Sequence, residues 1–227
     1  MTRIALLALA AFAPASTAAA LDLAVGKASF EAGAATDYVS KGISKTRGEP
    51  QVYGGVKWTR DAVYASAWAS NVDMSAGGDA EIVLTAGVTP KLAETSFNFA
   101  AIYKTYPNTL PGLREDMWEW RAEASRAFGP VKLRLRTDYS ADNYGSAEEA
   151  WWVETQAGWK LDDRTELGAG FGVRDQDGGA DYRAWSVGVK RALSDHAALD
   201  VRWWDTDRRE LGVAYEGRLA ADLKITF

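Results

Sequence analysis

The fold is indicated most clearly by the last nine residues, Leu219-Ala220-Ala221-Asp222-Leu223-Lys224-Ile225-Thr226-Phe227. Apolar side chains occupy every second position from Leu219 to Phe227, and three of the four positions between them are polar. A β-strand with this period turns one face toward an apolar phase and the other toward water. A soluble sheet on a core and a membrane barrel both give this pattern, so the rest of the chain must decide between them.

The same strand resembles the terminal strand of outer-membrane β-barrels, which the bacterial barrel-assembly machinery recognises. That strand usually ends on Phe and has hydrophobic residues at the alternate positions before it. Leu219, Leu223, Ile225 and Phe227 match this form, and Ala221 stands where a larger residue is common. The resemblance implies that the four matching residues form an assembly signal. It also implies the assembly machinery and outer-membrane lipid as partners, and the cell outer membrane as the location.

The first twenty residues have the pattern of a cleaved signal peptide. A basic start at Arg3 precedes an uninterrupted apolar run over residues 4–12, and three alanines at 18–20 come before Leu21. An N-terminal anchor helix is the alternative, but the run is shorter than the ~20 residues that a bilayer requires. We therefore expect a signal peptide over 1–20 and one outer-membrane barrel domain over 21–227.

Composition agrees with export. The chain has no Cys, which excludes a disulfide scaffold and a lipoprotein anchor, and it carries ten Trp, nine Tyr and seven Phe. No apolar run after the signal peptide reaches the length of a transmembrane helix. The net charge of −5 is scattered along the chain, which argues against nucleic acid as a partner.

Alternating segments recur about twelve times along the chain. The third segment is ambiguous, because Val63, Ala65 and Ala67 compete with Tyr64 and Trp68 for the outward face. The apolar faces of the twelve predicted strands begin at Phe30, Val52, Val63, Ile82, Phe97, Trp118, Val131, Trp151, Leu167, Trp185, Ala197 and Val213.

Short and long connections alternate between these segments. Compact turns are predicted at 59–62, 89–94, 129–130, 161–164 and 192–195, and longer polar loops at 41–49, 73–79, 105–116, 140–149, 174–181 and 205–210. Short periplasmic turns and long external loops are typical of an all-β, up-and-down antiparallel transmembrane barrel of about twelve strands. An even strand number places both termini in the periplasm. A soluble sandwich has no reason to separate its loops in this way.

Aromatic residues gather near the predicted strand ends, where amphipathic rings settle at the level of the lipid headgroups. The short-turn rim would hold Trp58, Tyr64, Phe128, Trp159 and Phe227, and the long-loop rim Tyr103, Trp118, Tyr139, Trp151, Trp185 and Trp203.

Charged residues occupy the face opposite the apolar one and would line the lumen. If Gly129 and Pro130 form a tight hairpin, Glu123 lies opposite Arg136 and Arg121 lies opposite Asp138, so opposite charges meet across the ladder. The candidates for contact with solutes are Arg121, Glu123, Lys132, Arg134, Arg136, Asp138 and Glu154.

The basic row on one strand has two interpretations. It could form a positive track for small anionic solutes, or it could supply ion-pair partners to carboxylates on neighbouring strands. The row consists of Lys132, Arg134 and Arg136, and the carboxylates are Glu119, Glu123 and Glu154.

Residues 36–46, 50–58 and 64–73 resemble the opening hairpins of the TorF family, a group of proteobacterial outer-membrane proteins catalogued as porins of unknown function. The family pattern is Asp-Tyr, two residues, Gly-Ile-Ser and then Gln, with an aromatic residue and Arg before the Gly. Here Ser40-Lys41 replaces the aromatic-Arg pair and Lys45 replaces Gln. The resemblance implies a pore-type barrel and supplies no substrate. We expect Asp37 and Asp73 to serve loop geometry rather than chemistry.

An enzyme is not expected. The one histidine, His196, follows Ser194-Asp195 in a predicted periplasmic turn, which is the wrong side for surface lipid and poor geometry for a catalytic triad. Residues 175–178 are too few for a calcium loop of the EF-hand kind. No catalytic residue, cofactor or metal ligand is therefore predicted.

Two functions follow from this reading of the chain. The first is a porin for passive diffusion of small polar or anionic solutes. The second is a closed structural or adhesive barrel without transport, whose loops at 106–115 and 142–149 bind a partner. A barrel of eight strands is filled and one of sixteen is open, so twelve strands leave both possible. The solute, the ion selectivity and the oligomeric state are left open.

Overall fold

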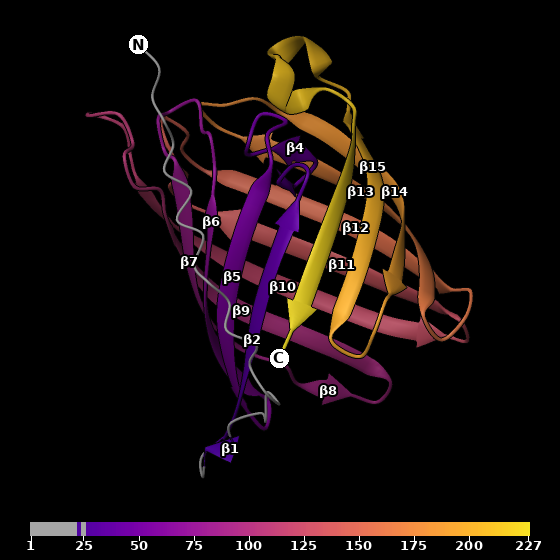
Figure 1. Ribbon diagram of the computed structural model, residues 1–227. Helices are drawn as coiled ribbons and strands as arrows, with labels where there is room; N and C mark the ends of the chain where they lie inside the picture. Colours follow the sequence, from indigo (N-terminus) through magenta and orange to yellow (C-terminus); the bar gives the residue numbers. More distant parts are fainter. Residues whose placement is uncertain (1–21, 24–25) are drawn as a thin grey trace, which may run out of the picture.

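The computed structural model describes residues 22–23 and 26–227, which form one all-β barrel (Figure 1). The predicted signal peptide over 1–20 lies outside the described residues. None of the described helices is long and apolar enough to cross a membrane.

Twelve antiparallel strands form the barrel wall, and β16 pairs with β2 to close it. Each strand is also paired with its neighbour in the chain, so the topology is up-and-down, as predicted. The strands are β2 (Gly26–Ala35), β5 (Gln51–Arg60), β6 (Val63–Asn71), β7 (Ala80–Val88), β9 (Thr95–Thr105), β10 (Asp116–Phe128), β11 (Val131–Ser140), β12 (Ala150–Lys160), β13 (Thr165–Gln176), β14 (Tyr182–Ala192), β15 (Ala197–Thr206) and β16 (Arg218–Thr226).

Six short elements lie outside the wall. β1 (Asp22–Leu23) pairs with β2, and β8 (Lys91–Leu92) pairs with β9. β3 (Val39–Ser40) and β4 (Ile43–Ser44) form a separate small hairpin, and two 3-10 helices, η1 (Arg209–Leu211) and η2 (Val213–Tyr215), lie in the last long loop.

Short turns gather at one end of the barrel and long loops at the other, as the alternation predicted. In Figure 1 the turn with β8 is at the bottom, and the loop with the two 3-10 helices is at the top. We call these the short-turn end and the long-loop end.

The outer face is apolar on every strand. Phe30 on β2, Leu135 on β11 and Val187 on β14 are 50%, 50% and 59% exposed, and each of the other nine strands also exposes a large apolar side chain. A water-soluble monomer rarely exposes an apolar patch larger than a few hundred Å². The wall is therefore that of a transmembrane barrel surrounded by lipid.

The face of the third strand is settled by burial. Val63 is half exposed on the outer face, whereas Tyr64 is buried and donates a hydrogen bond to Asn98 at 3.0 Å. Tyr64 therefore faces the lumen, and its predicted place among the rim aromatics in lipid is wrong. Alternation could not decide this face, because small alanines and large aromatics compete on the strand.

The last strand begins later than its alternation indicated. The sequence predicted a strand from Val213, but Val213 and Tyr215 belong to η2 and the strand starts at Arg218. Gly212 has a φ of 109°, which breaks extended backbone. The Thr206 hydroxyl then donates to the Tyr215 carbonyl at 2.8 Å and fixes the loop over the mouth.

The closing seam carries the fewest paired residues. β16 and β2 have five registered pairs, while the other eleven seams of the wall have between seven and eleven. Backbone bonds between Phe30 and Phe227, at 2.8 and 3.0 Å, extend the seam at the short-turn end.

Candidate functional site: a hairpin across the lumen

The loop between β2 and β5, residues 36–50, folds into the barrel and carries the β3–β4 hairpin. Val39 pairs with Ser44 and Ser40 with Ile43, which leaves a two-residue turn at Lys41 and Gly42. Both turn residues have positive φ, 53° and 82°, as a tight type I′ turn requires. In Figure 1 β4 lies inside the barrel near the long-loop end. We call this segment, residues 36–50, the lumen hairpin.

Asp37 holds the lumen hairpin together and attaches it to the wall. One carboxylate oxygen accepts hydrogen bonds from the Ser44 hydroxyl at 2.6 Å and the Thr46 hydroxyl at 2.8 Å. The other oxygen accepts from Arg218 of β16 at 2.7 Å. Asp37 is buried, so these charge-assisted bonds form away from water, where they are strong. The sequence interpretation of Asp37 as a residue of loop geometry agrees with these contacts.

The tip of the lumen hairpin reaches the opposite wall. Lys41 Nζ forms an ion pair with Glu119 of β10 and another, at 3.2 Å, with Asp138 of β11. The Tyr182 hydroxyl of β14 donates to the Lys41 carbonyl at 2.9 Å. β10 and β11 lie about half-way round the barrel from β2, so the hairpin spans the lumen.

A second lysine fixes the returning half of the lumen hairpin. Lys45 Nζ lies 2.7 Å from Glu81 of β7 and donates to the Tyr106 hydroxyl at 3.1 Å. The Tyr106 hydroxyl in turn donates to Glu81 at 2.9 Å. Both lysines are mostly buried, and each has a buried carboxylate partner, so the hairpin is held by charges that water screens little.

Burial also changes how these groups titrate. Burial lowers the pKa of Lys41 from 10.5 to about 8; the Lys104 and Arg174 charges add to this effect, and Glu119 and Asp138 oppose it. Burial lowers the pKa of Lys45 as well, against the charge of Glu81. The lumen hairpin therefore contains one amine, that of Lys41, which can lose its charge at moderately alkaline pH.

The predicted ladder between β10 and β11 has the expected register. Glu123 is paired with Arg136 and Arg121 with Asp138, so the prediction from the 129–130 turn is confirmed. Arg121 Nε lies 2.7 Å from Asp138, whereas Glu123 forms its ion pair diagonally, with Arg134 at 3.3 Å.

Carboxylates accompany the two arginines of the basic row. Arg134 and Arg136 lie 3.3 and 3.4 Å from Glu154 of β12, and Arg136 lies 3.4 Å from Asp138. Within the part of the chain that the structure describes, Lys132 forms no ion pair. These contacts favour the pairing interpretation of the row over an unpaired anionic track.

Two cavities lie on the two sides of the lumen hairpin. The first, which we call the lumen cavity, has about 260 Å³, and Asp37, Tyr38 and Val39 form its hairpin side. The second, which we call the vestibule cavity, has about 470 Å³ and lies beneath the long loops. Ser40 and Lys41 belong to its hairpin side.

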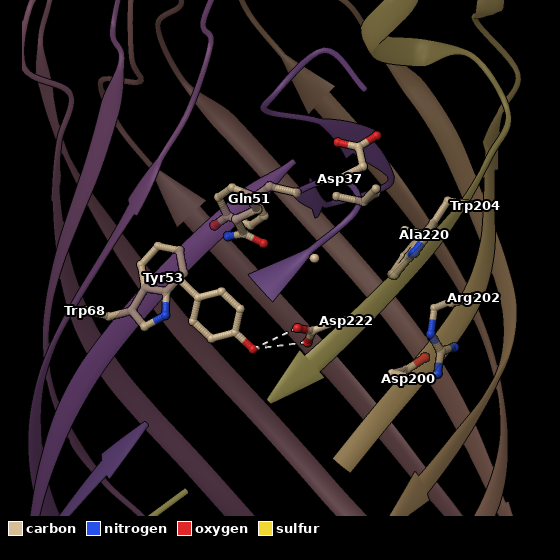
Figure 2. A pocket seen from close by; sticks show the side chains of 12 residues that line it. Asp37, Gln51, Tyr53, Trp68, Asp200, Arg202, Trp204, Ala220 and Asp222 are labelled. Atoms are coloured by element: carbon tan, nitrogen blue, oxygen red, sulfur yellow. Dashed lines mark hydrogen bonds and ion pairs between the residues drawn. The ribbon is translucent and has the colours of Figure 1, made fainter. Parts of the chain in front are cut away.

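The lumen cavity is acidic and aromatic (Figure 2). The Tyr53 hydroxyl donates to Asp222 at 2.9 Å, and Asp222 is paired across the ladder with Asp200. Arg202 lies 3.2 Å from Asp200, and Trp68 packs beside Tyr53 with ring centroids 5.7 Å apart. Figure 2 shows these side chains coming from β5, β6, β15 and β16 toward one space.

The remaining predicted residues are placed as follows. The residues of the proposed assembly signal, Leu219, Leu223, Ile225 and Phe227, lie on the outer face of β16 or just beyond its end, and Leu219 is 63% exposed. His196 is exposed, and its Nδ1 lies 3.0 Å from the Thr226 carbonyl at the short-turn end. Among residues 22–23 and 26–227, no group of three His, Asp or Glu side chains could hold a metal ion.

Sequence reasoning missed the lysines of the lumen hairpin as site residues. The Lys41-Gly42 pair between Val39-Ser40 and Ile43-Ser44 is compatible with a hairpin, but no local pattern indicates that the hairpin points inward. The signal that could have revealed it is the excess of carboxylates on the predicted lumen face near the long loops, Glu81 and Glu119 among them, which require cations from elsewhere.

Comparison with known proteins gives one family match. A family model described as "Bacterial protein of unknown function (Gcw_chp)" matches residues 24–225. No curated protein matches the chain. The TorF name is not among these matches and stays a resemblance.

Solved structures with the same fold are outer-membrane porins and channels. The KdgM porin superposes with a TM-score of 0.61 at 8% identity, covering 88% of this chain and 99% of the porin. The NanC porin gives 0.56 at 9% identity, covering 88% and 98%. The COG4313 outer membrane channel from Pseudomonas putida F1 gives 0.53 at 12% identity, covering 93% and 98%. At these identities the likeness shows the fold, which is that of an outer-membrane β-barrel.

Proposed function

The chain belongs to the Gcw_chp family of bacterial proteins, and from that premise and its fold we propose that it is a porin-like channel of the outer membrane. Small polar or anionic solutes would diffuse through it, past the lumen hairpin. The long-loop end would face outward and both termini the periplasm, as in barrels with short periplasmic turns.

The observation that carries this proposal is the pair of cavities, each lined in part by charged residues, inside a closed barrel. Each cavity is lined by charged side chains and by hydroxyl or amide groups, and the lumen hairpin contributes residues to the lining of both. A filled structural barrel would close this space with packed side chains. The KdgM porin, which has the same fold, was solved in complex with disordered oligogalacturonate, and that supports an anionic solute here.

The closed barrel remains the second candidate, because the ion pairs of Lys41 and Lys45 attach the lumen hairpin to the wall. In this case the long loops would bind a partner and no solute would pass. The two candidates differ in one measurable property, which is the conductance of the folded barrel with its hairpin intact.

Planar-bilayer recordings test the choice. We expect discrete conductance steps from the wild-type barrel, and larger steps when a Gly-Ser linker of equal length replaces residues 39–44, because the constriction is then removed. The matched control replaces residues 89–94 at the short-turn end and should conduct like the wild type. Heat-modifiable gel mobility shows that each protein is folded.

A folded wild-type barrel without conductance would contradict the channel. If the 39–44 replacement then conducts while the wild type does not, the closed barrel is supported instead.

A further inference from the structure

Arg174, near the long-loop end of β13, is a buried cation that faces the vestibule cavity. Its side chain lies between Trp152 of β12 and Tyr182 of β14 in the ladder, and the residue is 8% exposed. Arg174 belongs to the lining of this cavity, which has a volume of about 470 Å³.

The other cations near this cavity have carboxylate partners. Lys41 and Lys104 both contact Glu119, and Lys45 contacts Glu81. Across the described ranges, 22–23 and 26–227, Arg174 has no carboxylate within ion-pair distance. Its Nε donates to the Gln176 side-chain oxygen at 2.9 Å, and one terminal nitrogen donates to the same oxygen.

A buried guanidinium without a counter-charge is unfavourable, so its presence requires an explanation. Arginine has five donors in a planar fork, and a single amide oxygen occupies only two of them. The remaining donors match a carboxylate, which an arginine binds through two parallel hydrogen bonds. Small-molecule sites are concave and contain a few polar or charged groups that fix the orientation of the ligand, and Arg174 can serve as such a group.

The rest of the vestibule lining is suited to a hydroxylated molecule. Tyr182 and Tyr215 present two rings that meet edge to face at 5.4 Å, which gives an apolar surface beside the guanidinium. Ser75 and Ser146 add hydroxyl groups on the loop side. The cavity falls within the range of about 300–1,000 Å³ that small-molecule sites occupy.

We propose that the vestibule cavity is a binding site for a small hydroxylated carboxylate, such as an acidic monosaccharide, with Arg174 as the residue that binds its carboxylate. This site deepens the proposed function, since it names the solute class that would collect at the long-loop end before it reaches the lumen hairpin. Binding itself does not require transport.

Titration calorimetry on the folded full chain in detergent, at constant low ionic strength, tests the site with sodium glucuronate as the probe. We expect glucuronate to bind and glucose, which lacks the carboxylate, to bind at least about tenfold more weakly. The substitution Arg174→Gln should weaken glucuronate by at least about tenfold, because it removes the charged fork. Arg174→Lys should give an intermediate affinity, because a point charge replaces that fork.

The matched control is Arg191→Gln, which removes one positive charge from an exposed residue at the short-turn end and should leave the affinity unchanged. If Arg174→Gln fails to fold, the weaker binding of Arg174→Lys decides. Wild-type affinity in a folded Arg174 variant, or phosphate binding as tightly as glucuronate, would overturn the proposal. A barrel that binds glucuronate but passes no current would overturn the channel function and leave the binding site standing. A barrel that conducts but does not bind glucuronate would overturn the binding site and leave the channel function standing.

Discussion

At the scale of single residues, Lys41 is subject to two opposing effects. Burial disfavours its charged form, and the carboxylates of Glu119 and Asp138 favour it. Burial is the larger effect, so the pKa of Lys41 falls to about 8. The chain therefore holds its lumen hairpin across the barrel with an amine that is costly to keep charged.

This balance predicts a pH dependence of conductance. With the hairpin docked, Lys41 has a pKa of about 8, whereas a hairpin withdrawn into water would restore the usual 10.5. Between these two values the withdrawn state binds more protons, so docking gains stability as the pH rises. We expect single-channel conductance to fall between about pH 8 and pH 10.5, the interval set by the two pKa values of Lys41.

Two substitutions check the assignment to this amine. Lys41→Met is neutral at every pH and should weaken the pH dependence, and the part that remains would belong to Lys45, whose pKa burial also lowers. Lys41→Arg stays charged throughout and should remove the Lys41 contribution as well. A conductance that increases over the same pH range would contradict the prediction.

At the scale of elements, the contact between the lumen hairpin and the wall depends on a glycine. Gly42 lies at the tip with a φ of 82°, and a Cβ built on it would overlap the Cβ of Ala184 on β14. Gly48, at the base of the same segment, has a similar φ of 88°, but a Cβ there would meet only Arg218 at 3.8 Å. The two glycines share the same backbone constraint and differ in their distance from the wall.

This difference predicts unequal effects of one substitution. Gly42→Val should push the tip off β14 and increase the single-channel conductance, since overpacking of a close contact costs about 1–3 kcal/mol. Gly48→Val carries the same positive-φ strain without the overlap and should leave the conductance near the wild-type value. Equal conductances of the two variants would show that backbone strain, and not contact with the wall, sets the position of the hairpin.

Most of the wall could be predicted from the sequence because each strand lies between two phases. Lipid outside and water inside impose a period of two on every strand, so strand number, loop alternation and the 129–130 register follow from the residues themselves. The two positions where the structure differs from the prediction, Tyr64 and Val213, lie where the difference between the lipid-facing and water-facing residues is weak. Tyr64 stands among alanines, and Val213 lies in a loop over the mouth.

The site was less predictable than the wall. The ladder charges on β10 and β11 follow from local register, but the contacts of Lys41 and Lys45 join residues 78 and 36 positions apart across the lumen. No periodicity in a loop specifies whether it folds inward or outward. Whether this loop folds inward depends on the buried carboxylates that pair with its lysines, and these carboxylates are brought together only when the barrel is closed.

At the scale of the whole molecule, the two cavities differ in the sign of their charges. Lys41, Lys45, Lys104 and Arg174 face the vestibule cavity, with Glu119 as the acidic residue of that lining. The lumen cavity instead has Asp37, Asp200 and Asp222 against Arg202. A solute or ion that crosses the barrel therefore meets a positive region and then a negative one.

This order of charges predicts an asymmetric current. Oriented channels should pass unequal currents at equal positive and negative voltages in 0.1 M salt. The reason is that the positive region attracts anions and the negative region attracts cations, so reversing the voltage changes which ion enters from which end. In 1 M salt the Debye length falls from about 10 Å to about 3 Å, so the asymmetry should largely disappear. The measurement is the current–voltage curve at both salt concentrations.

The double substitution Asp200→Asn with Asp222→Asn provides the control, since it removes the negative charge of the lumen cavity and should change the asymmetry in 0.1 M salt. Symmetric curves from the wild type at low salt would contradict the prediction.

The closing seam between β2 and β16 has a mechanical consequence. Its five registered pairs are fewer than those of any other seam in the wall, and the rest of the ladder resists separation with seven pairs or more. Because β2 begins and β16 ends at the short-turn end, a pull on the termini opens the bonds of this seam one after another, and the seam with the fewest pairs takes the least work to separate. A barrel pulled by its two ends in a force spectrometer should therefore separate first at the seam between β2 and β16, and the remaining strands should then separate one after another.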